Sequence, residues 1–436
     1  PLTKINLSQF TLHDANVAKE KFSQQRYFRY PGRASINLRG ANSSVEDESS
    51  ITVYLTEAQR AAALLVASVP NTVGVNGDTT LYTKSPAASG VRTMAYNGVD
   101  DPYTEDVNGI LTEFWDPGPI VLNVVPGGVI DIAQNANGEI TTCSFTGCNS
   151  VGDHSSECYC PLRGIEVKEY PDVILPVTLR AIFHFGEGTL KIHMSETVAQ
   201  SLVDLTKIKI FNNTSSGGIA LQSATILGET GPVVTVKFIE SQRIELIKLA
   251  GTLGGDGTPL ILQVLNGAFS DLGRNQQESV TLQGAEAIEE IPDLLGPKVL
   301  KAHLFFSNGT MVLYGDETID ASVSSKVNMS NIFIANDGSD FQLPIIGGVP
   351  TLEQTMQLQV SLPAQLVGKA IKISQTFDGG SVVLNLLASA IEDLSGNKNG
   401  ELTAIQVVEY PDTEPPLVVG ATIDYSNSLL ILACNE

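Results

Sequence analysis

The sequence predicts an all-β protein composed of tandem antiparallel β-sandwich repeats of about 120 residues. The first observation behind this prediction is an internal repeat. Three segments that begin at Pro176, Pro297 and Pro416 share one pattern, in which an alanine is followed fifteen positions later by a glutamate. The spacing of the alanines, 121 and then 119 residues, sets the repeat length at Ala181, Ala302 and Ala421.

The second observation is the alternation of side-chain character within each repeat. Apolar Leu190, Ile192 and Met194 are separated by polar Lys191 and His193, a period of two that is typical of a strand with one buried face. Short runs rich in Gly, Ser and Asn interrupt the paired strands and predict hairpin turns. These turns occupy residues 186–188, 307–309 and 426–428.

A Glu-x-Pro-Asp linker precedes each repeat, in the same phase as the alanines. The three linkers occupy residues 169–172, 290–293 and 409–412. Proline stiffens the chain and offers no donor to a strand ladder, so these linkers fit domain boundaries.

Two further motifs recur within the repeats. An Asp-x-x-x-Asn ending is found at residues 271–275 and 393–397. A Glu-x-Gln-Arg motif follows a strand-like run at residues 57–60 and 240–243. We expect short helical turns after Glu57 and Glu240, because Ala- or Leu-rich stretches follow them.

Charge and composition exclude several functional classes. The chain has 26 Lys and Arg against 48 Asp and Glu, and its net charge of −22 argues against a nucleic-acid partner. No apolar run is long enough for a transmembrane helix. The five His are scattered and Asp153-His154 is the only suggestive catalytic pair, so no enzyme is expected.

The repeats resemble the SbsA-type bacterial Ig-like domains of surface-layer and large extracellular repeat proteins. The strand beginning at Pro176, the pairs Ser195-Glu196 and Asp316-Glu317, and the two Asp-x-x-x-Asn endings carry this resemblance, which covers residues 1–100 and 169–436. Similar repeats occur in algal extracellular proteins of the flagellar-hair type. The resemblance implies Ig-like sandwiches that serve as spacers, adhesive modules or assembly units.

These patterns divide the chain into five parts. They are an Ig-like domain at 1–100 that lacks its first two strands, a cysteine-rich insert at 101–168, complete repeats at 169–289 and 290–408, and two orphan strands at 409–436.

The two ends of the chain are expected to complement one another. Residues 1–7 match the segments that begin at Asp204 and Asn328, so the first domain lacks the opening strands that the last segment contains. We expect the last strands of one subunit to complete the first domain of the next by strand donation. A cut from a longer repeat protein is the alternative. The predicted interface residues are Leu2, Ile5, Leu7, Val418, Ile423, Leu430, Leu432 and Cys434.

Residues 1–40 carry a balance of +5, which leaves −27 for the rest of the chain. The strip from Arg26 to Arg33 mixes aromatic and basic residues. An ordinary solvated hairpin face is one interpretation of this strip. A contact with an acidic neighbouring subunit or with anionic polysaccharide is the other, whereas a single-stranded nucleic acid is not expected on so acidic a chain.

The cysteines are expected to form two disulfides, because four of them crowd into eighteen residues and the repeats look extracellular. Zinc is disfavoured by the cramped Cys-x-Cys spacing. The spacing also resembles part of an EGF-like module. The fifth cysteine, Cys434, takes the position of Met194 and is expected to be a buried thiol. The predicted disulfide cysteines are Cys143, Cys148, Cys158 and Cys160.

Six Asn-x-Ser/Thr sequons predict N-linked glycans if the source is a eukaryote. Asn308 lies at an expected hairpin tip, and the overlapping Asn212 and Asn213 are not expected to be occupied together. The sequons are at Asn6, Asn42, Asn212, Asn213, Asn308 and Asn328.

No cofactor is expected. Asp172, Asp293 and Asp412 near the linkers, with Asp271 and Asp393, could gather structural Ca²⁺ between domains. We favour the alternative that these side chains hydrogen-bond their own turns.

The sequence therefore predicts an extracellular or cell-surface structural protein, the subunit of a filament or appendage that polymerises head to tail with copies of itself. The alternative function is a cell-surface adhesin or carbohydrate-binding repeat protein. That alternative needs an aromatic-lined groove, for which the sequence offers Trp115 and scattered tyrosines.

Overall fold

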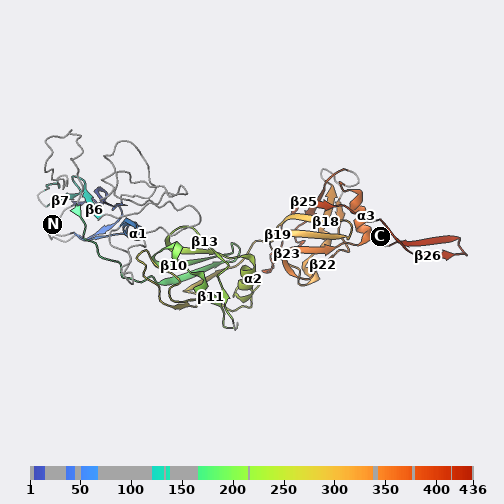
Figure 1. Cartoon of the computed structure of the whole chain (residues 1–436), viewed down its shortest axis with the longest axis horizontal. Helices are drawn as coiled ribbons and strands as arrows, with labels where there is room; N and C mark the ends of the chain where they lie inside the picture. The colour runs from blue at the N-terminus through green and yellow to red at the C-terminus, as the bar shows by residue number, and fades with distance from the viewer. Residues whose placement is uncertain are drawn as a thin grey trace, which may run out of the picture.

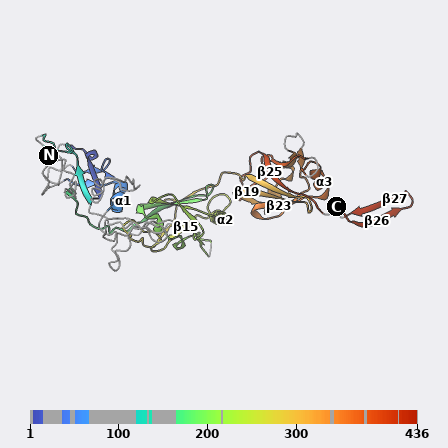
Figure 2. The same ribbon diagram turned by 45° about the horizontal axis from the view of Figure 1, so that its top comes forward.

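The computed structural model describes residues 4–14, 36–44, 51–66, 120–131, 134–137, 165–214, 217–336, 342–375, 379–413 and 415–434. The described residues form three β-rich units followed by a separate hairpin. The units lie in a row, with the first unit at one end and the hairpin projecting beyond the third unit at the other (Figure 1). The same order is seen in the rotated view (Figure 2).

The second unit, residues 170–291, is a two-layer β-sandwich of the Ig-like class, as predicted. Its two sheets have five and four strands and enclose one apolar core, in which Phe183, Leu190 and Ile192 are fully buried. The first sheet runs in the order β13 (Thr225–Leu227), β14 (Gly231–Lys237), β10 (Thr189–Val198), β9 (Thr178–His184) and β17 (Ile288–Ile291). The second runs β12 (Ile219–Ala220), β11 (Ile208–Phe211), β15 (Ile261–Val264) and β16 (Val280–Leu282).

The hairpin β9–β10 occupies the middle of the five-stranded sheet. β10 pairs antiparallel with β14 on one side, and β9 pairs parallel with β17 on the other. Strands in this position have no exposed edge, so their main-chain groups are paired on both sides. Their alternate side chains are buried because one face of the sheet packs against the second sheet.

The third unit, residues 292–410, repeats this plan around a hairpin of β18 (Val299–Phe305) and β19 (Thr310–Asp320). Its strand β25 (Leu402–Tyr410) pairs with β24 and with β18, and so joins the two layers into one eight-stranded sheet. The remaining strands are β20 (Ile332–Asn336), β21 (Gln342–Pro344), β22 (Val349–Pro350), β23 (Gln354–Ser361) and β24 (Val382–Leu386).

In the first unit, the largest sheet of the described residues has the order β3 (Ile36–Asn37), β2 (Phe10–Asp14), β6 (Ile120–Val124) and β8 (Ile165–Glu166). Two short pairs flank it, namely β4 (Asn42–Ser43) with β5 (Val53–Tyr54), and β1 (Lys4–Ile5) with β7 (Val129–Ile130). The strands β6, β7 and β8 fall within the range 101–168 that was expected to be an insert. That expectation is corrected, because the sheet of the first unit needs strands from both ends of this range.

The expected match between residues 1–7 and the later repeats is displaced by five positions. A short 3-10 helix at Leu7–Gln9 corresponds to the ones at Leu205–Lys207 and Met329–Asn331. Each is capped by a side chain that accepts a hydrogen bond from the residue two positions on, and the caps are Asn6, Asp204 and Asn328. The residue equivalent to Ile208 is therefore Phe10 rather than Ile5.

The helices expected after Glu57 and Glu240 are present as α1 (Glu57–Val66) and α2 (Glu240–Leu249). A third helix, α3 (Ala364–Lys372), lies at the same place in the third unit, although its sequence has no Glu-x-Gln-Arg motif. Among the described residues, none of the helices has the length and apolar character needed to cross a membrane.

The chain ends in the terminal hairpin, formed by β26 (Val418–Asp424) and β27 (Leu429–Cys434). Among the described strands, these two pair only with each other. An isolated hairpin is at best marginally stable in water, so its relation to the other units is the main question that the fold raises.

Candidate functional site

The terminal hairpin repeats the geometry of the two central hairpins. Its strands pair Ile423 with Leu430 and Ala421 with Leu432. The corresponding pairs in the second unit are Phe183 with Leu190 and Ala181 with Ile192. The central hairpins of the second and third units and the terminal hairpin all have a register shift near the open end. The sequence repeat is therefore a structural repeat down to the register of each pair.

The terminal hairpin differs from its counterparts in exposure. Leu190 and Ile192 are fully buried, whereas Leu430 and Leu432 are 63% and 54% exposed. Ile423, which replaces the fully buried Phe183, is 52% exposed. Monomeric soluble proteins rarely expose a contiguous apolar face, and such a face usually marks an interaction site.

The first unit has the complementary feature within its described residues. In the second unit the central hairpin lies between β14 and β17. The first unit has β5 in the place of β14, since β4 and β5 pair in the same manner as β13 and β14. A Glu-x-Pro-Asp linker also follows its last strand, β8. Among the described residues, however, no pair of strands occupies the place in a sheet beside β5 that the central hairpin has beside β14.

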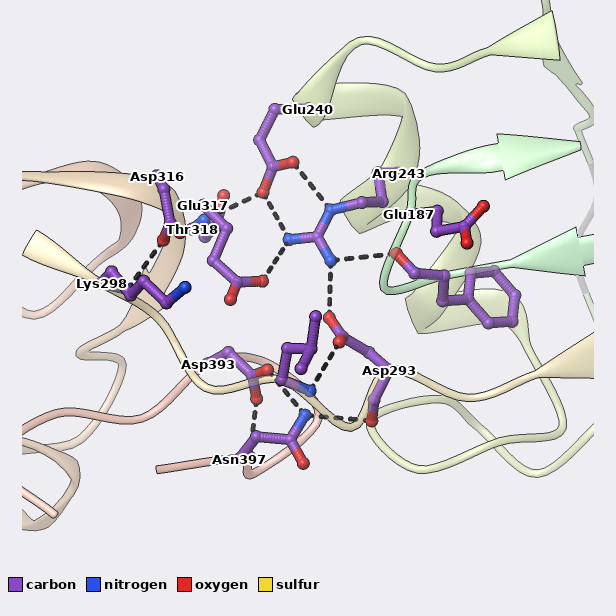
Figure 3. Close-up of polar contacts among 12 residues, drawn as sticks. Glu187, Glu240, Arg243, Asp293, Lys298, Asp316, Glu317, Thr318, Asp393 and Asn397 are labelled. Carbon is purple, nitrogen blue, oxygen red and sulfur yellow. Dashed lines mark hydrogen bonds and ion pairs between the residues drawn. The ribbon is translucent and has the colours of Figure 1, made fainter. Parts of the chain in front are cut away.

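The recurring motifs meet at the junction between the second and third units (Figure 3). Arg243 of α2 lies at the centre of this junction. Its Nε and Nη2 donate to Glu240 of the same helix at 2.7 and 2.8 Å, its Nη1 donates to Asp293 at 2.7 Å, and its Nη2 donates to Glu317 at 2.8 Å. Because these carboxylates come from the helix, the linker and the next unit, one guanidinium group ties three segments together.

Main-chain hydrogen bonds extend this junction. Glu240 Oε1 accepts a hydrogen bond from the backbone N–H of Thr318 at 2.9 Å. Asn397 Nδ2 donates to the main-chain carbonyl of Asp293 at 3.0 Å and to Asp393 at 2.8 Å. The Glu-x-Gln-Arg, Glu-x-Pro-Asp, Asp-Glu and Asp-x-x-x-Asn motifs thus form one continuous contact.

The junction between the first and second units is built in the same way. Arg60 of α1 binds Glu57 at 2.8 and 2.9 Å, Glu196 at 2.6 Å, and Asp172. Glu57 also accepts the backbone N–H of Thr197 at 2.6 Å. The Arg60 side chain is 30% exposed whereas that of Arg243 is 6% exposed, so the second junction is the more desolvated of the two.

The glutamine of the Glu-x-Gln-Arg motif holds each helix to its own unit. Gln242 accepts from the backbone N–H of Ile239 at 3.3 Å and donates to the carbonyl of Ala220 at 3.0 Å. Gln59 makes the matching bonds to Thr56 and to Asn37. The motif thus fixes the start of the helix and leaves its glutamate and arginine to reach the next unit.

The carboxylates at the junctions respond differently to this environment. Burial raises the pKa of Glu196 to about 7 and that of Glu317 to about 8, although the nearby arginines oppose the change. Burial also acts to raise the pKa of Glu240, but hydrogen bonds from Arg243 and Thr318 outweigh it and lower that pKa. Both glutamates consequently retain a proton to higher pH than an exposed carboxyl group does, and Glu317 does so further than Glu196.

Three carboxylates gather at each junction, with ligand atoms within 4.8 Å of one another: Asp172, Glu196 and Asp271 at the first and Asp293, Glu317 and Asp393 at the second. These residues could hold a cation, but an arginine already binds two members of each group. Asp271 and Asp393 also accept the backbone N–H of Asn275 and Asn397, each at 2.7 Å. This agrees with the favoured prediction that aspartates bond their own turns.

The third unit lacks the arginine of this arrangement. Just before α3, the backbone N–H of Leu362 donates to the carbonyl of Gly309 in the hairpin turn at 2.7 Å. Before α2, the N–H of Phe238 makes the equivalent hydrogen bond to the carbonyl of Gly188. Counting from these bonds, the glutamate and arginine positions are occupied by Ala364 and Val367. The junction that precedes the terminal hairpin is therefore not held by a guanidinium group from α3.

The predicted interface residues fall into two groups. Ile5 and Leu7 pack against the small core of the first unit, and Leu2 lies outside the described residues. Val418, 61% exposed, and the other residues predicted in the terminal hairpin are exposed. Cys434 is exposed too, which corrects the expectation of a buried thiol, because no described residue of this chain covers its hairpin. The structure does not bring the two groups together within one chain.

The sequons differ in exposure. Asn212 is 1% exposed and its amide donates to Leu249 O at 2.8 Å and to Asp256 at 2.9 Å, which argues against a glycan there. Asn213 is exposed, and so are Asn6, Asn42, Asn308 and Asn328, where glycosylation stays a prediction. The expected disulfide cysteines, Trp115, the basic strip 26–33 and Asp153-His154 lie outside the described residues.

No family model and no curated protein matches this sequence. Weak structural similarity was found to the N-terminal part of the bacterial S-layer protein SbsC, at 9% identity and a TM-score of 0.20, over 54% of this chain and 44% of that one. A titin fragment matches at 10% identity and a TM-score of 0.19, over 54% of this chain and 100% of its own.

The Ig1-2 module of a Drosophila receptor protein tyrosine phosphatase, DLAR, matches at 9% identity and a TM-score of 0.13, over 55% of this chain and 100% of its own. Similarities at this level carry no argument about function.

Replacing Arg243 with Gln is expected to loosen the junction between the second and third units. Removing one partner of a buried ion pair costs about 3–5 kcal/mol, because the remaining charges stay desolvated. Hydrogen exchange at the Thr318 amide, which donates to Glu240, measures this loss locally. Lys248→Gln is the matched control, since its ion pair with Glu245 is exposed and is worth about 0–1 kcal/mol. Equal protection in the two variants would contradict the prediction.

Protection of the same junction is expected to fall as the pH rises. The pKa of Glu317 is about 8 in the folded chain and has an ordinary value of 4.5, so the folded state retains a proton that the unfolded chain has lost. The stability that this group contributes is complete below 4.5 and is lost as the pH rises through 8. Glu317→Gln should flatten the pH dependence of Thr318 protection, whereas exposed Glu353→Gln should leave it unchanged.

Proposed function

We propose that this protein is a structural subunit of an extracellular filament or cell-surface appendage, and that it polymerises head to tail. In this proposal the terminal hairpin of one copy enters the first unit of the next copy. It lies there between β5 and the segment that follows β8, where the second and third units hold their own hairpins. The observation that carries the proposal is the exposed apolar face of the terminal hairpin.

The pairing register supports insertion of this hairpin as a strand pair. In the second unit Leu190 lies opposite Val236, and β14 is flanked by β13. The same correspondence places Leu430 of one copy opposite Val53 of the next. Main-chain hydrogen bonds to β5 would supply affinity and the alternate apolar side chains would fill the core, which is the usual division of roles in strand addition.

The arrangement of the units favours a partner copy over closure within one chain. The first unit and the terminal hairpin lie at opposite ends of the row in both views (Figures 1 and 2). The arginine-centred junctions hold the units in this order. A head-to-tail contact between identical chains produces an open filament unless its rotation closes a ring.

Burial of the hairpin face would contribute favourably to the joint. Fully burying one large apolar side chain contributes about 1.5–3 kcal/mol, so Ile423, Leu430 and Leu432 together supply on the order of 5–9 kcal/mol before the cost of association. The small apolar core of the first unit also gains from the insertion. Its described core has only five buried residues, Phe10, Ile36, Leu38, Ile120 and Val124.

One observation favours the alternative function of a carbohydrate-binding or adhesive protein. A strip of rings lies on the face of the third unit opposite its core. Phe305 and Tyr410 stack at 4.3 Å between centroids, and His303 lies 5.6 Å from Tyr410 and 4.8 Å from Tyr314. Flat ring faces of this kind can receive the apolar side of a sugar. Retention on immobilised polysaccharide that Tyr410→Ala abolishes would support this function.

Substitutions on the two faces of β27 test the filament proposal. Leu430→Asp places a charge on the apolar face and is expected to abolish fibres in negative-stain images, because a carboxylate cannot be buried there without a partner. Ile431→Asp is the matched control, since it lies on the opposite face where the second unit has Lys191. It should leave assembly intact.

Removal of residues 409–436 should likewise give monomers. If the wild-type chain forms no fibres at all, the hairpin face is covered by something other than a second copy, as the alternative of a longer continuous repeat chain requires. That outcome would contradict the proposal.

A further inference from the structure

The first unit has an Asp-x-x-x-Asn turn that the recurring motifs did not reveal. Asn135 donates through its backbone N–H to Asp131 Oδ1 at 2.7 Å and through Nδ2 to Asp131 Oδ2 at 2.9 Å. The Asp131 N–H donates to the Asn135 carbonyl at 3.0 Å, and Gln134 adopts a positive φ of 65°. The turn comes after β7 and before β8, the last strand of its unit. Its counterparts likewise precede the last strands of their own units.

The counterparts in the second and third units have the same internal hydrogen bonds. Asn275 bonds Asp271 at 2.7 and 2.9 Å, and Asn397 bonds Asp393 at 2.7 and 2.8 Å. A positive φ also occurs one residue before each asparagine, at Arg274 (62°) and at Gly396 (83°). The three turns are therefore one structural element.

In the second and third units this turn binds the linker that enters the same unit. Asn275 Nδ2 donates to the main-chain carbonyl of Asp172 at 3.1 Å, and Asn397 Nδ2 donates to that of Asp293 at 3.0 Å. In each case the linker leads directly into the central hairpin of that unit. The turn consequently fixes where the hairpin enters the sheet.

The turn of the first unit is exposed, in contrast to these two. Asp271 and Asp393 are 0% and 1% exposed because a linker and a neighbouring helix cover them, whereas Asp131 and Asn135 are exposed. The remaining linker of this type, residues 409–412, leads into the terminal hairpin, whose register matches that of the hairpins the other turns accompany.

We infer that the Asp131–Asn135 turn is the docking site for the Asp412 linker of a second copy of this chain. In the joint, Asn135 Nδ2 donates to the main-chain carbonyl of Asp412 of that copy. This inference rests on the proposed function and adds the contact that positions the inserted hairpin. The contact also makes the insertion specific for one register, because a backbone carbonyl held at this point fixes where the following strands enter the sheet.

The contact matters more in this joint than at the internal junctions. There an arginine from α1 or α2 binds the linker aspartate as well, through Arg60 to Asp172 and Arg243 to Asp293. In the joint between copies, the helix of the unit before the linker is α3, which has Val367 at the position of the arginine. The turn therefore provides the polar anchor without help from a guanidinium group of α3.

Sedimentation equilibrium of the full chain tests this inference. Asn135→Ala should raise the dissociation constant for head-to-tail association by about 5- to 20-fold, since a carbonyl loses its donor at a desolvated joint. Asn135→Asp should have an effect at least as large, because it lacks the Nδ2 donor and also places a second carboxylate against that of Asp131. Asn275→Ala is the matched control. It alters the same turn at an internal junction and should leave the dissociation constant within about twofold.

The outcomes separate the two ideas. Equal dissociation constants for the wild-type chain and both Asn135 variants would overturn the docking site while leaving hairpin insertion in place. An equal effect of Asn275→Ala would show that the change acts through general loosening of the units, and would also overturn it. Absence of any association in the wild-type chain would overturn the insertion and the docking site together.

Discussion

The second and third units each depend on a two-stranded hairpin that has a strand on either side of it. The hairpins of the second and third units have apolar residues on one face and satisfy their outer main-chain groups through β14 and β17, or through β23 and β25. The terminal hairpin has the same register and the same apolar face, but no other described strand pairs with it. This constraint is the basis of the proposed assembly.

The junctions between units fix the order of the units along the row. Arg60 and Arg243 each bind carboxylates from three segments, so the order of the units and the orientation of each linker are set by charge-assisted hydrogen bonds. A row of units held in this way keeps the terminal hairpin far from the first unit of its own chain. The same geometry makes that hairpin available to a neighbouring copy.

Much of the fold could be predicted from the sequence because its signals are local. The alternation around Leu190 and the turns at 186–188 and 307–309 predicted the hairpins, and the Glu-x-Gln-Arg motifs predicted α1 and α2. The junctions could not be predicted in this way. Arg60 and Glu196 are 136 positions apart, and no local pattern indicates that two recurring motifs meet in space.

Two errors have identifiable causes. The match of residues 1–7 relied on the Leu-Thr-Lys-Ile run that residues 2–5 share with residues 205–208. The capping side chain of the 3-10 helix, Asn6, is instead the residue that shares a structural role with Asp204. The insert was placed too early because β6 and β8 belong to a sheet whose first strand, β2, lies more than a hundred residues before them. Long-range pairing of this kind leaves little trace in a single sequence.

The most direct test of strand insertion is a disulfide between copies. In a chain carrying C434S, Val53→Cys and Leu430→Cys should become cross-linked, because residues directly opposite in an antiparallel pair bring their Cβ atoms close together. Assembly of a mixture of ¹⁵N-labelled and unlabelled chains, followed by mass spectrometry, identifies the origin of each half of the bond. The account predicts cross-linked peptides that combine one labelled and one unlabelled half. Cross-links confined to a single isotope, or none at all in assembled material, would contradict it.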